Sequence, residues 1–291
     1  MAFPLRRVLD PQVEPVTLSA MKNYLRVDIT DDDALIGSLI SVARERAEDM
    51  TSRCLLPQQF AFAFDRFPSW GWAAWGNDDG QWGNHNHKHT MFKSAHLAII
   101  LPRGPVISVD SIKYVDQSGT VQTLDPTLYN ADLLSEPARI TPIHNGSWPS
   151  ALYDTNSVTI TFTAGYQQTV TELVTMPQTA PFTAALQRGA LSVSLTSCVD
   201  NTTKVAVSGA LSGGILTCAG ATAGEVLLVS YVVTSVPQSF IHAIKLLCDA
   251  WYNNRSEVVQ GSGNFNSMPM PVSATSLLGT YQLFPVGYPR G

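Results

Sequence analysis

The sequence predicts an α+β protein with three parts: a core with long amphipathic helices, an antiparallel β region, and an inserted, small all-β unit of sandwich type. Three observations lead to this fold class. Apolar residues recur at helical spacing near the N-terminus and again after Pro237. Between them, apolar and polar residues alternate with a period of two, which is typical of strands. Residues 167–236 contain few charged residues and consist mainly of strand-like runs rich in Ser, Thr, Ala, Gly and Val.

Composition limits the classes of function. Charged residues make up 14% of the 291 residues, against roughly 25% in ordinary soluble domains. Such a low content fits a chain that buries much of its surface against partners, but it also suits β-rich domains with Ser/Thr surfaces. The net charge of −5 argues against a protein that binds nucleic acid tightly through contacts with the phosphate groups. An acidic surface past which DNA slides without sticking is still compatible with this charge.

The sequence contains no signal for secretion or for membrane insertion. The opening residues include two arginines but no apolar run after them, and no apolar stretch reaches the length of about 18 residues that a span requires. The four cysteines, Cys54, Cys198, Cys218 and Cys248, form no CxxC pair, so zinc-ribbon and thioredoxin-like sites are not expected. We expect free, mostly buried thiols in a reducing compartment. A disulfide between Cys198 and Cys218, which share the β-rich segment, is the alternative.

Two helices are predicted near the N-terminus. Thr17 is a suitable N-cap for a short helix that carries Leu18, Met21 and Leu25. A second helix of about six turns should run from 32 to 53, with one of the aspartates at 31–33 as its cap. Its apolar stripe is formed by Ile36, Ile40, Ala43, Ala47 and Met50. Glu45, Glu48 and Asp49 are expected on the opposite, solvent side. The stripe can pack on its own domain or line a subunit interface.

A β region follows this helix. The first strand is expected around Phe60, Phe62 and Phe64, which alternate with alanines. Residues 68–94, rich in Gly, Trp, Asn and His, show no period and predict a long exposed loop. Further strands are expected at 97–101, 106–115, 121–124, 128–131, 139–141 and 158–163. The second and third of these should form a hairpin.

The chain is therefore divided into a core (1–166 plus 237–258), an inserted β domain (167–236) and an extended C-terminal docking tail (259–291). The last helix should start near Pro237 and present Phe240, Ile244, Leu247 and Trp251 on one side. The tail ends in an apolar cluster of five residues, Leu277, Leu278, Tyr281, Leu283 and Phe284. We expect this cluster to dock on its own domain or on a neighbouring subunit.

Two groups in the loop 68–94 are candidate sites. His85, His87 and His89 share one face of an extended chain and are candidate metal ligands, although their spacing matches no standard zinc pattern and a solvated loop is the favoured interpretation. The second group consists of the tryptophans Trp70, Trp72, Trp75 and Trp82. These rings either form an interface or fold back on the β region.

Signatures of catalysis are absent from the sequence. It contains no GxSxG, GxxxxGK[ST], HExxH or GxGxxG motif. We therefore expect no enzyme activity, no catalytic residues and no cofactor. Asp132, Glu136 and Arg139 are expected to form no more than a surface ion pair.

The stretch VTLSAMKNYLRVDITDDDALIGSLISVARERAEDMTSRCLL resembles the opening of the head–tail connector (adaptor) family of long-tailed bacteriophages. Leu25-Arg26-Val27-Asp28, the acidic turn 31–33 and Thr51-Ser52-Arg53 stand where that family has its short-helix end, its acidic turn and a Thr-Gly-Arg-like motif. Ser52 departs from the usual glycine. The segments 101–132, 148–166 and 236–258 are also similar, so the resemblance covers 13–166 and 236–258. The loop 68–94 and the insertion 167–236 lie outside the minimal pattern.

The resemblance implies a structural protein of the virion neck that is assembled in the host cytoplasm. It would form a ring of about twelve subunits under the portal protein. The ring would extend the DNA channel and give neck and tail-completion proteins a docking platform. Genomic DNA would pass through its lumen without sequence-specific binding, and no membrane would be involved. One alternative is a glycan- or host-surface-binding virion module on 167–236. A less favoured one is a metal-dependent hydrolase that uses His85, His87 and His89.

Overall fold

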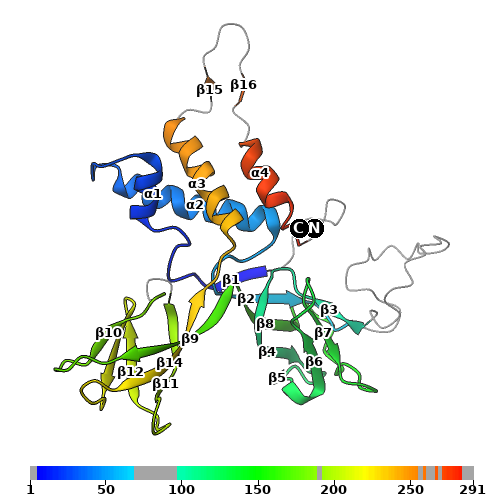
Figure 1. Ribbon diagram of the computed structural model, residues 1–291. Coiled ribbons are helices and arrows are strands. Elements are labelled where there is room, and N and C mark those ends of the chain that lie inside the picture. The colour runs from blue at the N-terminus through cyan, green and yellow to red at the C-terminus, as the bar shows by residue number, and fades with distance from the viewer. Residues whose placement is uncertain are drawn as a thin grey trace. The chain divides into compact units, whose positions relative to one another are not determined.

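The computed structural model describes residues 5–68, 97–188, 192–254, 258–259, 266–267 and 271–283 (Figure 1). The chain divides into two compact units. Unit 1 comprises 1–165 together with 239–291, and unit 2 comprises 166–238. Helices and antiparallel sheets are both present, so the predicted α+β class is confirmed.

Four α-helices occur among the described residues: α1 (Leu18–Leu25), α2 (Asp33–Thr51), α3 (Gln238–Asn253) and α4 (Val272–Gly279). The Thr17 side chain caps α1 as predicted, because its Oγ1 accepts a hydrogen bond from the amide of Ala20 at 3.2 Å. Apolar side chains of all four helices are buried. They include Met21, Ile36, Ile40, Ala43, Ala47, Phe240, Ala243, Ile244, Leu247, Ala274 and Leu278. Together they form the helical part of unit 1 (Figure 1).

Helix α4 differs from the extended tail expected for 259–291. Pro271 precedes its first turn, and Ala274 and Leu278, four residues apart, are both buried. The helix packs against α2, and the ring of Tyr281, just after it, lies 4.8 Å from that of Phe240 on α3. The tail therefore completes the helical layer of its own unit. Two short strands, β15 (Val258–Val259) and β16 (Asn266–Ser267), pair before it.

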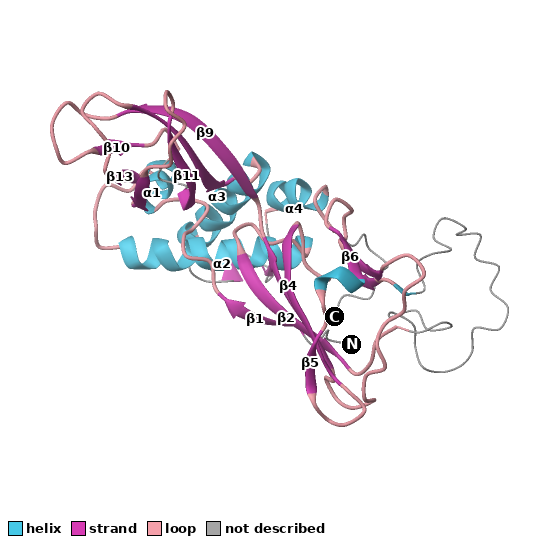
Figure 2. Cartoon of the chain, turned by 90° about the horizontal axis from the view of Figure 1, so that it is seen from below, coloured by secondary structure: helices cyan, strands magenta, loops and turns pink. Residues whose placement is uncertain are grey.

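The larger sheet of unit 1 has five strands: β1 (Leu5–Leu9), β2 (Gln58–Phe64), β4 (Val106–Val115), β5 (Val121–Thr123) and β8 (Val158–Ala164). Their order is β1-β2-β8-β4-β5 and every neighbouring pair is antiparallel (Figure 1). Figure 2 labels four of these strands, β1, β2, β4 and β5. The predicted hairpin is β4–β5. The sequence analysis missed β1, whose five residues are too few for a periodic signal; it forms the edge beside β2.

A second, three-stranded antiparallel sheet consists of β3 (Ile99–Ile100), β6 (Tyr129–Asp132) and β7 (Arg139–Pro142), in the order β3-β7-β6. Both sheets contribute to one apolar core that contains Phe162, Ile112 and Ile140. Trp148 closes this core: its ring stacks on Phe67 at 5.0 Å, and its Nε1 donates to the carbonyl of Leu97 at 2.7 Å. A buried polar handle of this kind fixes the position of a large ring.

Unit 2 contains two three-stranded antiparallel sheets. The first, in the order β11-β14-β9, is built from Ser192–Asp200, Val226–Thr234 and Gln167–Thr175; the second, β10-β13-β12, from Thr183–Ala185, Ile215–Ala219 and Ser208–Ser212. Tyr231 and Leu216 are fully buried in a core to which both sheets contribute. Unit 2 thus has an apolar core of its own.

Gly165 occupies a position that no larger residue should tolerate. Its φ is +150°, and a Cβ there would come within 2.4 Å of the carbonyl carbon and oxygen of Leu56. We predict that Gly165→Ala lowers the free energy of unfolding by at least about 2 kcal/mol, because backbone must move to admit the methyl group. Chemical denaturation of the full chain measures this loss.

Gly37 provides the matched control for Gly165. It lies inside α2, and a Cβ there would meet nothing within 4 Å. Gly37→Ala should therefore stabilise the protein by up to about 1 kcal/mol through helix propensity. Equal effects of the two substitutions would contradict the steric explanation.

Candidate functional site: polar joints at the two ends of α2

The acidic turn before α2 connects three helices. The hydroxyl of Tyr252 in α3 donates to Asp32 at 2.6 Å, and the ammonium group of Lys22 in α1 lies 2.6 Å from a carboxylate oxygen of Asp33. Asp32 stands at the N-cap position of α2, but its side chain makes no capping hydrogen bond. The predicted capping role is therefore wrong for this side chain, because a partner on another helix takes up its carboxylate.

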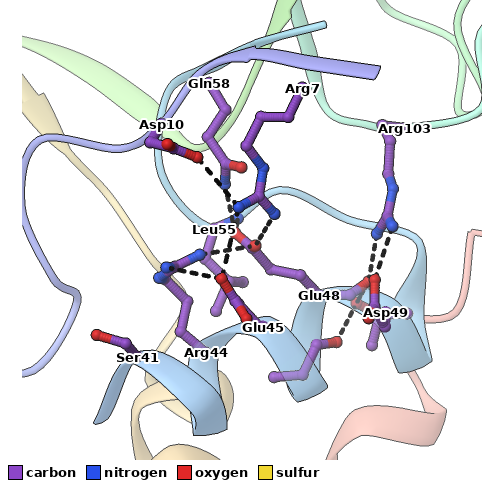
Figure 3. Close-up of polar contacts among 12 residues, drawn as sticks. Arg7, Asp10, Ser41, Arg44, Glu45, Glu48, Asp49, Leu55, Gln58 and Arg103 are labelled. Atoms are coloured by element: carbon purple, nitrogen blue, oxygen red, sulfur yellow. Dashed lines mark hydrogen bonds and ion pairs between the residues drawn. The ribbon is translucent and has the colours of Figure 1, made fainter. Parts of the chain in front are cut away.

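Glu48 lies near the other end of α2 and is 2% exposed, so its predicted position on the solvent side is wrong. One carboxylate oxygen accepts hydrogen bonds from the amide of Leu55 at 2.8 Å and from the Gln58 side chain at 2.7 Å. The other accepts from Arg44 Nη1 at 3.1 Å (Figure 3). The side chain thereby fastens α2 to the segment that leads into β2.

Arg44 extends this contact toward the N-terminus. It is 4% exposed, and its Nε donates to Glu14 at 2.9 Å. Ser41 donates to the other oxygen of Glu14 at 2.8 Å. Arg7 on β1 adds longer ion pairs of 3.8 Å to Glu48 and 3.5 Å to Glu45 (Figure 3). We call the set Arg7, Glu14, Arg44, Glu48 and Gln58 the helix–sheet joint.

In the helix–sheet joint, burial and the neighbouring charges have opposite effects on the pKa of Glu48 and on the pKa of Arg44. Burial raises the pKa of Glu48, although the hydrogen bond from Leu55 and the charge of Arg44 act against this shift. Burial lowers the pKa of Arg44, but the carboxylates of Glu48 and Glu14 outweigh it, and the net pKa of Arg44 is raised. Arg44 therefore stays cationic inside the protein, and it depends on its carboxylate partners to offset its desolvation.

The C-terminal end of α2 forms a second joint, which we call the Arg53 clasp. The helix ends at Thr51, and Ser52 turns the chain in the left-handed conformation with φ of 57°. Arg53 then donates through Nε to the carbonyl of Tyr281 at 2.6 Å and through Nη1 to Glu136 at 2.8 Å. A positive φ favours glycine, which explains why the residue before this arginine is usually glycine in the Thr-Gly-Arg-like motif.

The clasp corrects one expectation about ion pairs. Asp132 does pair with Arg139 at 2.9 Å, whereas Glu136 pairs with Arg53, 83 positions away in the sequence. Leu134, at the tip of the β6–β7 turn, is 98% exposed. These pairs and a hydrogen bond from the Ser135 amide to Asp132 at 3.1 Å hold the turn. Leu134 was not predicted as a site residue, because the neighbouring sequence does not indicate that Arg53 would help to fix this turn through its ion pair with Glu136.

Several predicted site residues lie outside the described part of the chain. These are Trp70, Trp72, Trp75, Trp82, His85, His87, His89 and Phe284. Of the tail cluster, Leu278 and Leu283 are buried within unit 1, while Leu277 and Tyr281 are half-buried. A role of these residues in contacts with other subunits stays a prediction.

Nowhere among the described residues do three or more His, Cys, Asp or Glu side chains gather as a metal site would require. None of their helices has the length and apolar character for a membrane span. All four cysteines are free and buried, as expected.

The polar groups described here connect the helices, the sheet edge and the C-terminal segment of unit 1. Residues 15–69 match the model of the family "Phage gp6-like head-tail connector protein". This segment includes α1, the acidic turn, α2 and the Thr51-Ser52-Arg53 motif. The predicted resemblance to the head–tail connector family is confirmed over this segment. No curated protein matches the chain.

Two solved structures have a similar fold. A chain in "Virion of native gene transfer agent (GTA) particle" aligns with a TM-score of 0.51 at 16% identity, over 99% of this chain and 100% of that chain. A chain in "Neck of empty GTA particle computed with C6 symmetry" aligns with a TM-score of 0.50 at 16% identity, over 98% of this chain and 99% of that chain. The alignments span both compact units, so the similarity of fold includes the inserted β unit.

We predict that Glu48→Ala lowers the free energy of unfolding by about 3 kcal/mol, because it leaves Arg44 buried without its partner on the same helix. Glu45→Ala is the matched control on the same helix. The side chain of Glu45 is 51% exposed, and its removal should change stability by no more than about 0.5 kcal/mol. Urea denaturation measures both values, and similar losses would show that burial of the pair is unimportant.

The Arg53 clasp should make stability depend on pH in the acid range. The hydrogen bond from Arg53 lowers the pKa of Glu136 below its ordinary value, so this contribution is complete above the unfolded pKa of about 4.3 and disappears as pH falls through the lowered pKa. Since Glu136 is partly exposed, we expect the wild type to exceed Glu136→Gln by only about 1 kcal/mol at neutral pH.

Denaturation from pH 7 to pH 3 measures this difference, which should shrink with acidification. In an Arg53→Ala background the difference should be close to zero at every pH. A difference that persists in that background would assign the effect to another partner of Glu136.

Proposed function

We propose that the chain is a structural virion protein, a head–tail connector of a tailed phage or phage-like particle. About twelve copies would form a ring under the portal, extend the DNA channel and present a platform to neck and tail-completion proteins. The family match at 15–69 carries this proposal. The similarity of fold to a chain of a particle neck, over nearly the whole length of both chains, supports it. Twelve subunits are compatible with the six-fold symmetry of that neck structure.

The ring wall would be built from the long amphipathic helices α2 and α3. A connector transmits force between head and tail, so its helices must not slide on the sheets that they cover. The helix–sheet joint supplies this resistance, since Glu48 and Arg44 connect α2 to β1, to the start of β2 and to Glu14. Opposite charges inside a protein specify one register, because any slip leaves a buried charge without its partner.

DNA would pass through the lumen without sequence-specific contact. The chain has 18 basic and 23 acidic residues, too few positive charges for tight binding to phosphates. A lumen of low or negative potential lets DNA move without sticking.

Contacts between subunits would come from preorganised apolar groups. Leu134 is 98% exposed on a turn held by two ion pairs, so ordering it against a neighbour requires little loss of entropy. We assign Leu134 to a contact with the adjacent subunit of the ring. Leu277 and Tyr281, with the tryptophans of the loop 68–94 and Phe284, are further candidates for contact with subunits or the portal.

A second candidate function rests on unit 2. Residues 200–208 and 219–226 line an open hollow of about 720 Å³, large enough for a small ligand. Its mixed lining includes the polar side chains of Asp200, Thr203 and Glu225, which are compatible with a saccharide and keep the glycan- or host-surface-binding alternative open. The hydrolase alternative depends on His85, His87 and His89, outside the described residues.

Electron microscopy of the chain co-expressed with its portal tests the connector proposal. We expect a ring stacked on the portal, and we expect Leu134→Ser to reduce the fraction of portals that carry a ring at least several-fold. A side chain this exposed contributes little to folding, so thermal stability should stay within about 0.5 kcal/mol of the wild type.

Leu173→Ser is the control, since Leu173 is 58% exposed on β9 in unit 2 and has no assigned contact. Equal loss of rings in both variants would withdraw the assignment of Leu134 alone. Portals and particle necks without density for this chain would overturn the connector proposal, and binding of the full chain to a glycan array would then favour the second candidate.

A further inference from the structure

Two buried cysteines of unit 2 lie next to each other. The sulfur atoms of Cys198 and Cys218 are 3.8 Å apart, and each residue is 4% exposed. Cys198 belongs to β11 and Cys218 to β13, so the two thiols come from different sheets of this unit. A bond between them would join both sheets covalently.

The strand β12 brings the thiols together. Its neighbour Val207 donates a backbone hydrogen bond to the carbonyl of Cys198 at 2.9 Å, and Gly209 is the register partner of Cys218. Gly209 has no side chain, and a Cβ there would lie 3.6 Å from Cys198 Cβ and 3.1 Å from Leu195 Cδ2. The strand β12 therefore passes directly beside the cysteine pair, in ordinary van der Waals range of Cys198.

We propose that Cys198 and Cys218 are a disulfide-forming pair that is open under reducing conditions and closes in an oxidising environment. Closure needs the sulfurs to approach by about 1.8 Å, to the bond length of about 2.05 Å. Rotation of the two side chains can supply a movement of this size. The proposal does not depend on the connector role, although that role would explain when closure happens, because a released particle leaves the reducing cytoplasm.

The oxidant is a small-molecule disulfide such as oxidised glutathione. The thiolate of Cys198 attacks one of its sulfurs and releases one glutathione thiolate; the thiolate of Cys218 then attacks the mixed disulfide and releases the second. Two cysteine protons are transferred to the two released glutathiones. The two electrons of the cysteine pair reduce the oxidant, so the step is balanced.

Closure should be slow in the folded protein. Burial raises the pKa of Cys198 to about 12 and also raises the pKa of Cys218, so few thiolates exist at neutral pH. The oxidant also needs a transient opening of unit 2 to reach a pair that is 4% exposed. The other two cysteines, Cys54 and Cys248, are buried in unit 1 and serve as internal controls.

The test uses the full chain in two arms. In the first arm, the native protein is incubated with oxidised glutathione. In the second arm, the protein is unfolded and refolded in a buffer of oxidised and reduced glutathione, so that the oxidant can reach both cysteines before they are buried. We expect loss of two of the four thiols, a mass lower by two hydrogen atoms, and one peptide pair linked through Cys198 and Cys218. The thermal transition of unit 2 should rise by roughly 10 °C, because the bond closes a loop of about 20 residues.

Cys218→Ala should abolish both the thiol loss and the thermal shift, whereas Cys248→Ala should leave both unchanged. A second variant, Cys198→Ala, should abolish both in the same way. Four free thiols after both arms, or a disulfide mapped to any other pair, would overturn the proposal. None of these results depends on ring formation, so failure here and failure of the connector proposal are distinguishable.

Discussion

The structure of unit 1 depends on one buried ion pair, Arg44 with Glu48, on the face of α2 that meets the sheet. Both residues are almost fully buried, and neither charge is tolerable there alone. Their remaining hydrogen-bonding groups reach Glu14, Leu55 and Gln58, so one pair specifies where the N-terminal segment, the helix and β2 lie relative to one another. A shift of the helix along the sheet would leave a buried charge without its partner, so this network favours the observed register.

The Arg53 clasp also uses a charged side chain to connect segments that are far apart in the sequence. Residues near positions 53, 136 and 281 meet at the end of α2, where the helix leaves carbonyl groups to be satisfied. The amide of Leu283 donates to the carbonyl of Thr51 at 2.9 Å, so the C-terminal segment itself caps the helix. This arrangement gives the family's Thr-Gly-Arg-like motif a physical role: the turn after Thr51 directs Arg53 toward both partners.

Unit 2 is stabilised mainly by its apolar core. It carries little charge, and its core is made by alternating side chains of two small sheets around Tyr231 and Leu216. A domain of about this size has a limited core and often needs an additional constraint. A covalent link between its sheets would supply such a constraint where the protein meets oxidising conditions.

The sequence alone determined the α+β class and most secondary structure. The periodicities around Met21, Ile40 and Phe62 are local, and local geometry converts them directly into helices and strands. The resemblance to the head–tail connector family also followed from motifs along the chain. Only the tertiary structure decided which polar side chains are buried and which partners they contact. Glu48 was expected in solvent because helical periodicity reports one apolar face and is silent about a charged residue whose partners are 7 and 10 positions away. The pairing of Arg53 with Glu136 depends on the folding of distant segments, which no local pattern encodes. The sequence offered Cys198 and Cys218 as a possible pair, but only the two folded sheets bring their sulfur atoms close together.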